Sequence, residues 1–207
     1  MIVKLATEAS VLEAMQIDGS IMLIEQAVIS ALHAATEEAA TLLLADFDAG
    51  TYTDDFHVLT MLQAGQCYTA QLALAHGFLS NTPVVKAATT YAGLADAEAL
   101  DAGEYKVDAE KGAITFISAT NYTGYYVRVT YAAGFTVDGT DDELFSDVPS
   151  WLQIAATKLS SAIIIETNPD LASDQNGNGR DPLKLRASAE RMLEKKTRYF
   201  PSPIRPF

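Results

Sequence analysis

One stretch of the chain, residues 122–156, constrains the fold more than any other. It contains the aromatic and β-branched run Tyr125-Tyr126-Val127-Arg128-Val129-Thr130-Tyr131, which is typical of a half-buried strand. Residues 132–135 end this strand. The run Val148-Pro149-Ser150-Trp151 then opens a helix, because proline is best tolerated in a first helical turn and Asp147 can cap the opening N–H groups. We therefore expect a strand followed by a helix whose apolar face packs back on the preceding chain.

Composition indicates a chain that can bury a core. The 207 residues are 49% hydrophobic, enough for one domain or for one domain with an insertion. No apolar run reaches the roughly 20 residues of a membrane span, and the first residues lack the pattern of a signal peptide. These features predict a soluble protein made and used in the cytoplasm. The single Cys67 excludes an internal disulfide and a thiolate metal cluster.

The net charge of −13 is unevenly distributed along the chain. Residues 1–150 carry 21 acidic and 5 basic side chains, whereas residues 151–207 carry 6 acidic and 9 basic ones. So acidic a body repels the DNA backbone, which argues against ordinary duplex binding. The basic C-terminal part suits docking on an acidic surface, although the charge alone also fits a simply well-solvated protein.

Two helices are expected before residue 50. Ser10-Val11-Leu12-Glu13 has the form of a capping box, which would start a short helix that stops at Asp18-Gly19. Ser20 or Asp18 can cap a longer helix that runs to about Leu44. Its alanine-rich apolar face suits close helix–helix approach, within the fold or against another copy. This face consists of Leu23, Ile24, Ala27, Val28, Ala31, Leu32, Ala34 and Ala35.

The central part of the chain predicts four to six antiparallel strands. The strand candidates are 56–62, more weakly 67–79, 84–91, 104–107, 113–117 and 125–131. Asp108-Ala109-Glu110-Lys111-Gly112 is a polar turn ending in glycine, which favours a hairpin between the runs on either side of it. The stretch 63–79 is also compatible with a helix.

Two further helices and an extended end complete the chain. An amphipathic helix is expected from Trp151 to about Thr167, and its run Ile163-Ile164-Ile165 indicates burial on two sides. Asn168-Pro169 ends it, and a last helix runs from Leu183 to about Arg198. The fold class is therefore α+β. We expect a helical body (1–50 and 148–198), an inserted antiparallel β unit (51–135), an acidic loop (136–147) and an extended, proline-rich C-terminal segment (199–207).

Few residues suggest a chemical site. Asp174, Asn176 and Asn178, followed by Gly179, match the first half of a calcium loop, but position 12 is Leu185 rather than glutamate. A flexible turn between helices is the competing interpretation. We therefore expect no metal site and no cofactor.

No catalytic constellation is visible in the sequence. His33, His57 and His76 have no ligand spacing, and the chain contains no phosphate loop or nucleophile elbow. The carboxylates of Asp54-Asp55 and Asp141-Asp142-Glu143 are expected in solvated loops. The sequence therefore predicts a protein that is not an enzyme.

The C-terminal segment is rich in apolar groups for a chain end. Disordered termini are normally poor in such groups, whereas an extended apolar peptide can dock by strand addition or into a groove. A frayed terminus is the alternative. The docking candidates are Arg198, Tyr199, Phe200, Pro201, Ile204, Arg205 and Phe207.

In order along the chain, these features resemble the head–tail connector proteins of tailed bacteriophages, also called adaptor or head completion proteins. The resemblance covers most of the chain. It rests on Ile17-Asp18, Leu23-Ile24, Ala27, Tyr105-Lys106-Val107-Asp108, Gly112-Ala113-Ile114, residues 127–135, Asp147-Val148-Pro149, Leu152, Ala155-Ala156 and Leu159.

The resemblance implies a structural virion protein, assembled in the host cytoplasm. Such proteins form a ring, commonly of twelve copies, beneath the portal. They extend the DNA channel and join the head to the tail or to a second neck protein. From their composition and their place in the chain, we expect the basic C-terminal helix and the apolar C-terminal segment to contact the portal. The acidic loop residues Asp138, Asp141, Asp142 and Glu143 would face the phage tail or a neighbouring copy.

Two other classes of protein stay open from the sequence. One is a tail-completion, decoration or other virion structural protein, which would bind tail tube or capsid instead of portal. The other is a calcium-dependent binding module, which depends only on residues 174–181. A thermal shift with calcium but not with magnesium would favour the binding module.

Overall fold

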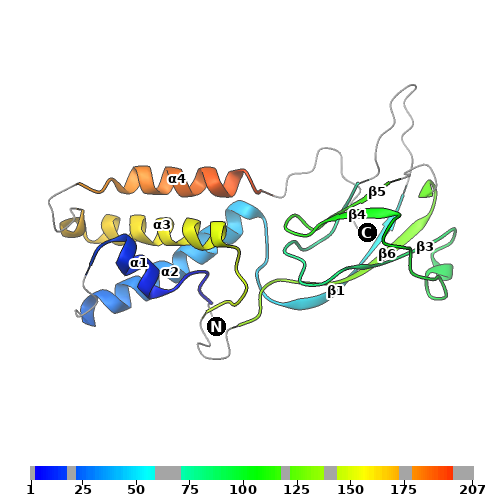
Figure 1. Ribbon diagram of the computed structural model, residues 1–207, viewed down its shortest axis with the longest axis horizontal. Helices are drawn as coiled ribbons and strands as arrows, with labels where there is room; N and C mark the ends of the chain where they lie inside the picture. Colours follow the sequence, from blue (N-terminus) through cyan, green and yellow to red (C-terminus); the bar gives the residue numbers. More distant parts are fainter. Residues whose placement is uncertain are drawn as a thin grey trace, which may run out of the picture. The chain divides into compact units, whose positions relative to one another are not determined.

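The computed structural model describes residues 3–17, 22–58, 71–117, 122–137, 144–172 and 179–197. The chain divides into two compact units. The helical unit contains Met1–Ala45 and Phe135–Thr197, and the β unit contains Asp46–Gly134 (Figure 1). Within the described ranges, the helical unit holds the four α-helices and the β unit holds the six strands. The prediction of an α+β fold is confirmed.

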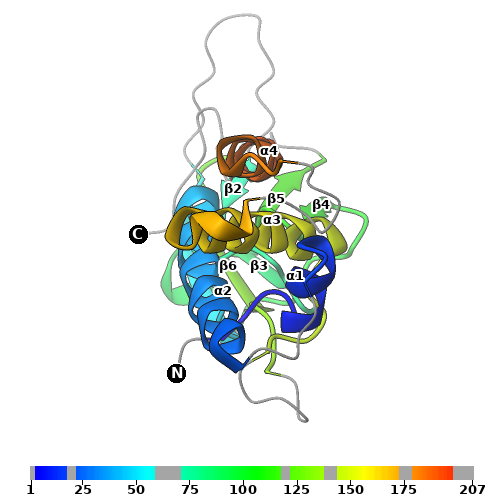
Figure 2. The same cartoon turned by 90° about the vertical axis from the view of Figure 1, so that its left-hand side faces the viewer.

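The helical unit is organised around one central helix. Its helices are α1 (Glu8–Ala14), α2 (Met22–Leu43), α3 (Ser150–Thr167) and α4 (Pro182–Glu194). Figures 1 and 2 show α3 with α4 on one side and α1 and α2 on the other, and α3 contacts all three. The expected burial of α3 on two sides is confirmed. Its buried residues are Leu152, Ala155, Ala156, Leu159, Ser160, Ser161, Ala162, Ile164 and Ile165.

The first helix begins earlier than the sequence predicted. Thr7, not Ser10, is the N-cap of α1, and its side-chain oxygen accepts a hydrogen bond from the Ser10 N–H at 3.2 Å. Ser10 instead donates its hydroxyl to the Thr7 carbonyl at 2.6 Å. Thr7 can cap the helix one turn earlier and leaves Glu8 in the first turn, where a carboxylate is favourable.

The two prolines before α3 and α4 play different parts. Pro149 is the N-cap of α3, one position before the first turn where we expected it, and no side chain caps the helix at that position. Pro182 does occupy the first turn of α4, and the Asp181 carboxylate accepts from the N–H groups of Leu183 and Lys184 at 3.0 and 3.4 Å. An aspartate directly before a first-turn proline is a strong helix start. The last helix therefore begins as predicted but ends at Glu194.

The second helix ends on a residue with left-handed backbone. The core face of α2 consists of Val28, Ala31, Leu32, Ala35, Ala39 and Leu43, whereas Ala34, expected on that face, is exposed. Leu44 follows with φ of 52°, and the Ala45 N–H donates to the Ala40 carbonyl at 3.1 Å. This is the bond pattern of a Schellman ending, in which glycine is the usual left-handed residue.

The β unit consists of two three-stranded antiparallel sheets. One has the order β1 (Gly50–His57), β6 (Tyr126–Ala133), β3 (Val84–Ala88), and the other β2 (Gln71–Ala73), β5 (Ala113–Phe116), β4 (Tyr105–Asp108). Both sheets contribute to one apolar core, as in a sandwich. The buried core residues include Phe56, Leu72, Val85, Ile114, Phe116, Val127, Val129 and Tyr131.

The predicted hairpin is confirmed. Asp108 of β4 pairs with Ala113 of β5, so residues 109–112 form the connection. Gly112 has φ of 63°, and a Cβ there would collide with the His76 carbonyl. Glycine is therefore required at this position both for its backbone conformation and for close approach.

The first strand differs from its prediction. β1 begins at Gly50, six residues before the expected strand 56–62, and residues 59–70 lie outside the described ranges. The expected strand 84–91 ends at Ala88 as β3, and Gln71–Ala73 is the described strand in the stretch where helix and strand were both open. The register of β1 is set by its partner β6, far along the chain, so the local pattern alone placed it wrongly.

Arg186 connects three helices of the helical unit. From α4, its guanidinium donates to Glu38 of α2 and, through two nitrogens at 3.0 and 3.3 Å, to Glu166 of α3. The hydrogen bonds that Arg186 donates to Glu166, and then to Glu38, raise the pKa of Arg186 above its ordinary value. A planar guanidinium suits this two-carboxylate site better than an ammonium group.

We expect the Arg186→Met variant to lower the free energy of unfolding by about 1–2 kcal/mol, because two carboxylates lose a partly exposed, charge-assisted partner. Urea unfolding of the variant and the parent chain measures this difference. Arg191→Met removes an exposed arginine from the same helix and should change the free energy by less than about 0.5 kcal/mol. Equal losses in the two variants would contradict the role given to Arg186.

A second prediction concerns Leu44. Its side chain is 68% exposed and its backbone is left-handed, so Leu44→Gly should stabilise the protein by about 0.5–1 kcal/mol. Ala34→Gly is the matched control, because it places glycine at an exposed, right-handed position of the same helix and should cost about 1 kcal/mol. Thermal unfolding of both variants gives the signs, and destabilisation by Leu44→Gly would rule out backbone strain at this position.

Candidate interaction surfaces

The site residues predicted from the sequence all lie outside the described ranges. This holds for the acidic loop residues Asp138, Asp141, Asp142 and Glu143. It also holds for the calcium-loop residues Asp174, Asn176 and Asn178, and for the C-terminal residues Arg198, Tyr199, Phe200, Pro201, Ile204, Arg205 and Phe207. The chain on either side of the acidic loop, and the helix that leads to the C-terminal segment, are described.

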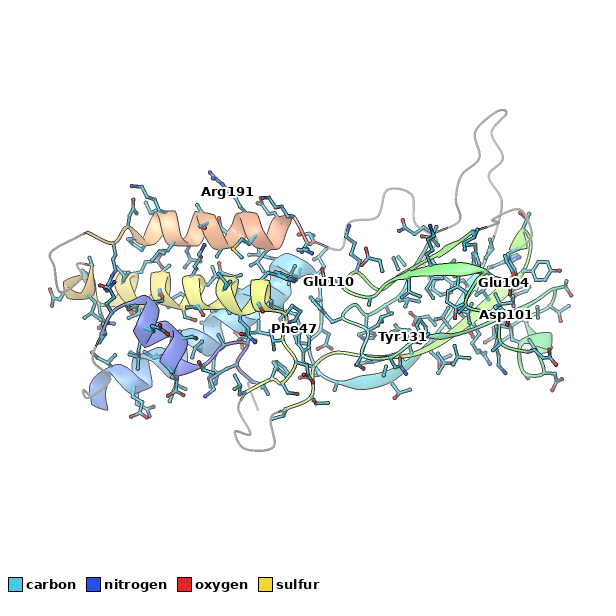
Figure 3. All side chains as sticks on the ribbon, viewed as in Figure 1. Phe47, Asp101, Glu104, Glu110, Tyr131 and Arg191 are labelled. Atoms are coloured by element: carbon cyan, nitrogen blue, oxygen red, sulfur yellow. The ribbon has the colours of Figure 1, made fainter. Side chains whose placement is uncertain are left out.

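One side of α4 is a cationic surface. Six residues spaced along one face of the helix line a groove of about 400 Å³, which we call the cationic face of α4: Lys184, Ala187, Ser188, Arg191, Met192 and Lys195. Lys184, Arg191 and Lys195 are exposed, and Arg191 extends from α4 on the side away from α3 (Figure 3). Small Ala187 and Ser188 lie between these long side chains and leave room for a ligand or a partner chain.

The opposite side of α4 explains why these cations face outward. Ala189 and Leu193 are fully buried, and the Lys196 ammonium lies 5.4 Å from the centre of the Trp151 ring. From α3, Lys158 Nζ donates to Ser188 Oγ at 2.9 Å, which adds a fourth cation beside the groove.

The charges on the cationic face of α4 are poorly compensated. Arg191 and Lys195 form no ion pair with any residue that the structure describes, and the Lys184 ammonium lies 3.6 Å from Asp181 with a side chain that is 85% exposed. Cations at such short helical spacings repel one another weakly. An acidic partner would relieve this repulsion. The positive charge of α4 would also attract such a partner and so speed its association.

The chain on both sides of the acidic loop is held together. Val137 pairs with Phe145, the Ser146 N–H donates to the Thr136 carbonyl at 2.7 Å, and the two hydroxyls of Thr136 and Ser146 lie 2.6 Å apart. The Phe145 N–H also donates to the Lys4 carbonyl at 3.0 Å. The four carboxylates of residues 138–143 are thus carried by a firmly anchored base.

A polar cluster lies inside the β unit. The Asp54 carboxylate, 8% exposed, accepts from the Tyr131 hydroxyl at 2.8 Å and from the Ala75 N–H at 2.6 Å. The His76 N–H donates to the Tyr131 oxygen at 3.2 Å, and the Tyr52 ring stacks on His76 with centroids 3.6 Å apart. Tyr131, labelled in Figure 3, is only 1% exposed, so its hydrogen bond to Asp54 ties β6 to β1 in the interior of the β unit.

A second cluster lies on the outer face of the sheet β1-β6-β3. Arg128 donates to both Asp55 oxygens at 2.7 and 2.8 Å, and the Tyr91 hydroxyl donates to the same carboxylate at 2.8 Å. The hydrogen bond from Arg128 is the main cause that lowers the pKa of Asp55. The expectation that Asp54 and Asp55 lie in a solvated loop is therefore wrong, because both belong to β1 and are bonded to β6. The alternation of inward and outward residues around Phe56 was the signal that could have placed them.

Neither a metal centre nor a membrane-spanning helix is found in the part of the chain that the structure describes. No three histidine, cysteine, aspartate or glutamate side chains converge there as a metal site would require. None of the helices there combines the length and the apolar character needed to cross a bilayer. The calcium-loop candidates are not tested by this result.

Comparison with known proteins leaves the family open. No protein-family model matches the chain, and no curated protein matches it. Among solved structures, a chain from the neck of an empty gene transfer agent particle, computed with C6 symmetry, is 15% identical, covers 99% of both chains and has a TM-score of 0.43. A chain from the virion of a native gene transfer agent particle is 13% identical, covers 97% of this chain and 96% of that one, and also has a TM-score of 0.43. Likenesses this weak establish neither the fold nor the function of this protein.

Proposed function

We propose that this chain is a structural protein of a virion neck: a head–tail adaptor that forms a ring beneath the portal, extends the DNA channel and joins head to tail. The observation that carries the proposal is the cationic face of α4, which leads into an apolar, proline-rich C-terminal segment on a protein whose net charge is −13. A protein that joins different partners needs such chemically distinct surfaces. The ordered resemblance to phage connector proteins supports the same role.

The acidic character of the chain suits a DNA channel. A wall with excess negative charge repels phosphate, so DNA can slide past it without sticking. The β unit carries ten carboxylates and four cations, and Arg128 is already paired with Asp55. The proposed contact with DNA is therefore passage without sequence-specific binding.

The proposed contact with the portal is the C-terminal segment. Its apolar residues Tyr199, Phe200, Ile204 and Phe207 follow a helix that ends at Glu194, so they can reach a partner without disturbing the helical core. An extended peptide with several prolines loses little entropy when it docks in a groove.

Deletion of residues 199–207 should lower the affinity for portal rings at least tenfold while the far-ultraviolet circular dichroism stays that of the parent chain. A pull-down with portal rings, followed by electron microscopy of the complex, measures the loss and shows whether parent rings stack on the portal. The Ser202→Ala variant is the control within the same segment and should bind like the parent. Undiminished binding by the truncated chain would exclude this portal contact, and binding to tail tube instead of portal would identify a tail-completion protein.

A further inference from the structure

We infer that the cationic face of α4 is a contact between copies, and that it receives the acidic segment 138–143 of the adjacent copy in the ring. This inference rests on the proposed function, because it names the surfaces through which the ring would close. It assigns the acidic loop to a neighbouring copy of the same chain and leaves the portal contact to the C-terminal segment.

The two surfaces carry equal numbers of charges of opposite sign. Residues 138–143 contain four carboxylates and no cation. The groove of α4 offers the exposed cations Lys184, Arg191 and Lys195, with Lys158 beside Ser188. Each surface carries unbalanced charge on its own, and contact between them would balance both.

The shape of the groove fits a polypeptide. Its floor includes the small residues Ala187 and Ser188, so a backbone can approach α4 closely between the long basic side chains. Met192 adds a flexible apolar surface, which adapts well to a partner chain. The groove is open along one face of the helix, as a docked loop requires.

The two ends of the acidic segment are bonded to each other at its base. The pair Val137 and Phe145 and the bonds between Thr136 and Ser146 hold the two ends of the segment together. Ordering a loop whose ends are already fixed costs less conformational entropy than ordering a free chain. The anchored base therefore favours this segment over the C-terminal one as the partner of α4.

The base of the acidic loop and the cationic face of α4 lie on opposite sides of the helical unit. The base of the acidic loop is bonded to Lys4 beside α1, whereas α4 packs on α3 and α2. Figures 1 and 2 both show the yellow-green chain that leads into α3 on the side of this unit away from α4. Two different surfaces on opposite sides of a subunit form a head-to-tail contact, which closes into a ring when the rotation between copies is right.

The test exchanges charge between the two surfaces in the full-length chain. The loop variant is Asp141→Lys with Asp142→Lys, and the helix variant is Arg191→Glu with Lys195→Glu. Each should lower the affinity between copies at least tenfold, measured by sedimentation and by native mass spectrometry. A chain with all four substitutions should form rings again, because the reversed charges once more attract.

A matched control separates the contact from net charge. Asp96→Lys with Glu98→Lys makes the same change of charge on an exposed acidic stretch of the β unit and should leave ring formation unchanged. If this control lost rings and the loop variant kept them, α4 would receive the β unit of its neighbour and the inference would be overturned. Failure of the four-substitution chain to recover rings would also overturn it.

Mixing gives a second readout. In a mixture of the two variants, the unchanged loop of the helix variant meets the unchanged α4 face of the loop variant. The two reversed surfaces also attract each other, as in the four-substitution chain, so the mixture should form rings in which the two variants alternate. A mixture that forms no rings, like each variant alone, would contradict this contact. If all of the charge variants formed rings as the parent chain does, this inference alone would be overturned. If the parent chain formed no ring, with or without portal, the proposed function would be overturned as well.

Discussion

Burial of α3 between α4 and the pair α1 and α2 is the constraint on which the helical unit depends. A helix buried on two sides carries little charge on its buried faces, and the buried residues of α3 are alanine, serine, leucine and isoleucine. Some of its polar contacts are local, such as Ser160 Oγ donating to the Ala156 carbonyl at 2.8 Å, and its charged residues Lys158 and Glu166 bind side chains of α4. Because α3 fills the centre of the helical unit, the charged residues of α2 and α4 lie at the edges of α3 and on the surface. There Arg186 of α4 binds Glu38 of α2 and Glu166 of α3.

The β unit also has a buried interior, and this interior contains a polar cluster inside an apolar sandwich. Asp54 is a buried carboxylate on a strand, and it is tolerated because Tyr131 and Ala75 both donate to it. The outer face of the same sheet carries the paired Arg128 and Asp55. Asp54, Asp55 and Arg128 thus fix strands in the β unit, whereas Arg191 and Lys195 on the cationic face of α4 form no ion pair with the residues that the structure describes.

Local patterns predicted the elements whose signals are local. The helix over α3, the start of α4 after Asp181 and the hairpin at Gly112 follow from periodicity, capping and turn residues. The extent of β1 could not be predicted in this way, because its register is set by β6, whose residues lie 69 to 83 positions further along the chain. The basic character of the last helix was visible in the sequence, but which of its cations remain unpaired depends on the contacts of Arg186 and Lys196 with other helices.

The pairing of Gly50 with Ala133 has a consequence for how this chain can vary. These residues begin β1 and end β6, so the inserted β unit enters and leaves through neighbouring strands. An insertion with adjacent ends can grow, shrink or be exchanged without changing the gap that its host must bridge. A change in the size of the inserted unit should therefore leave the packing of the four helices unchanged.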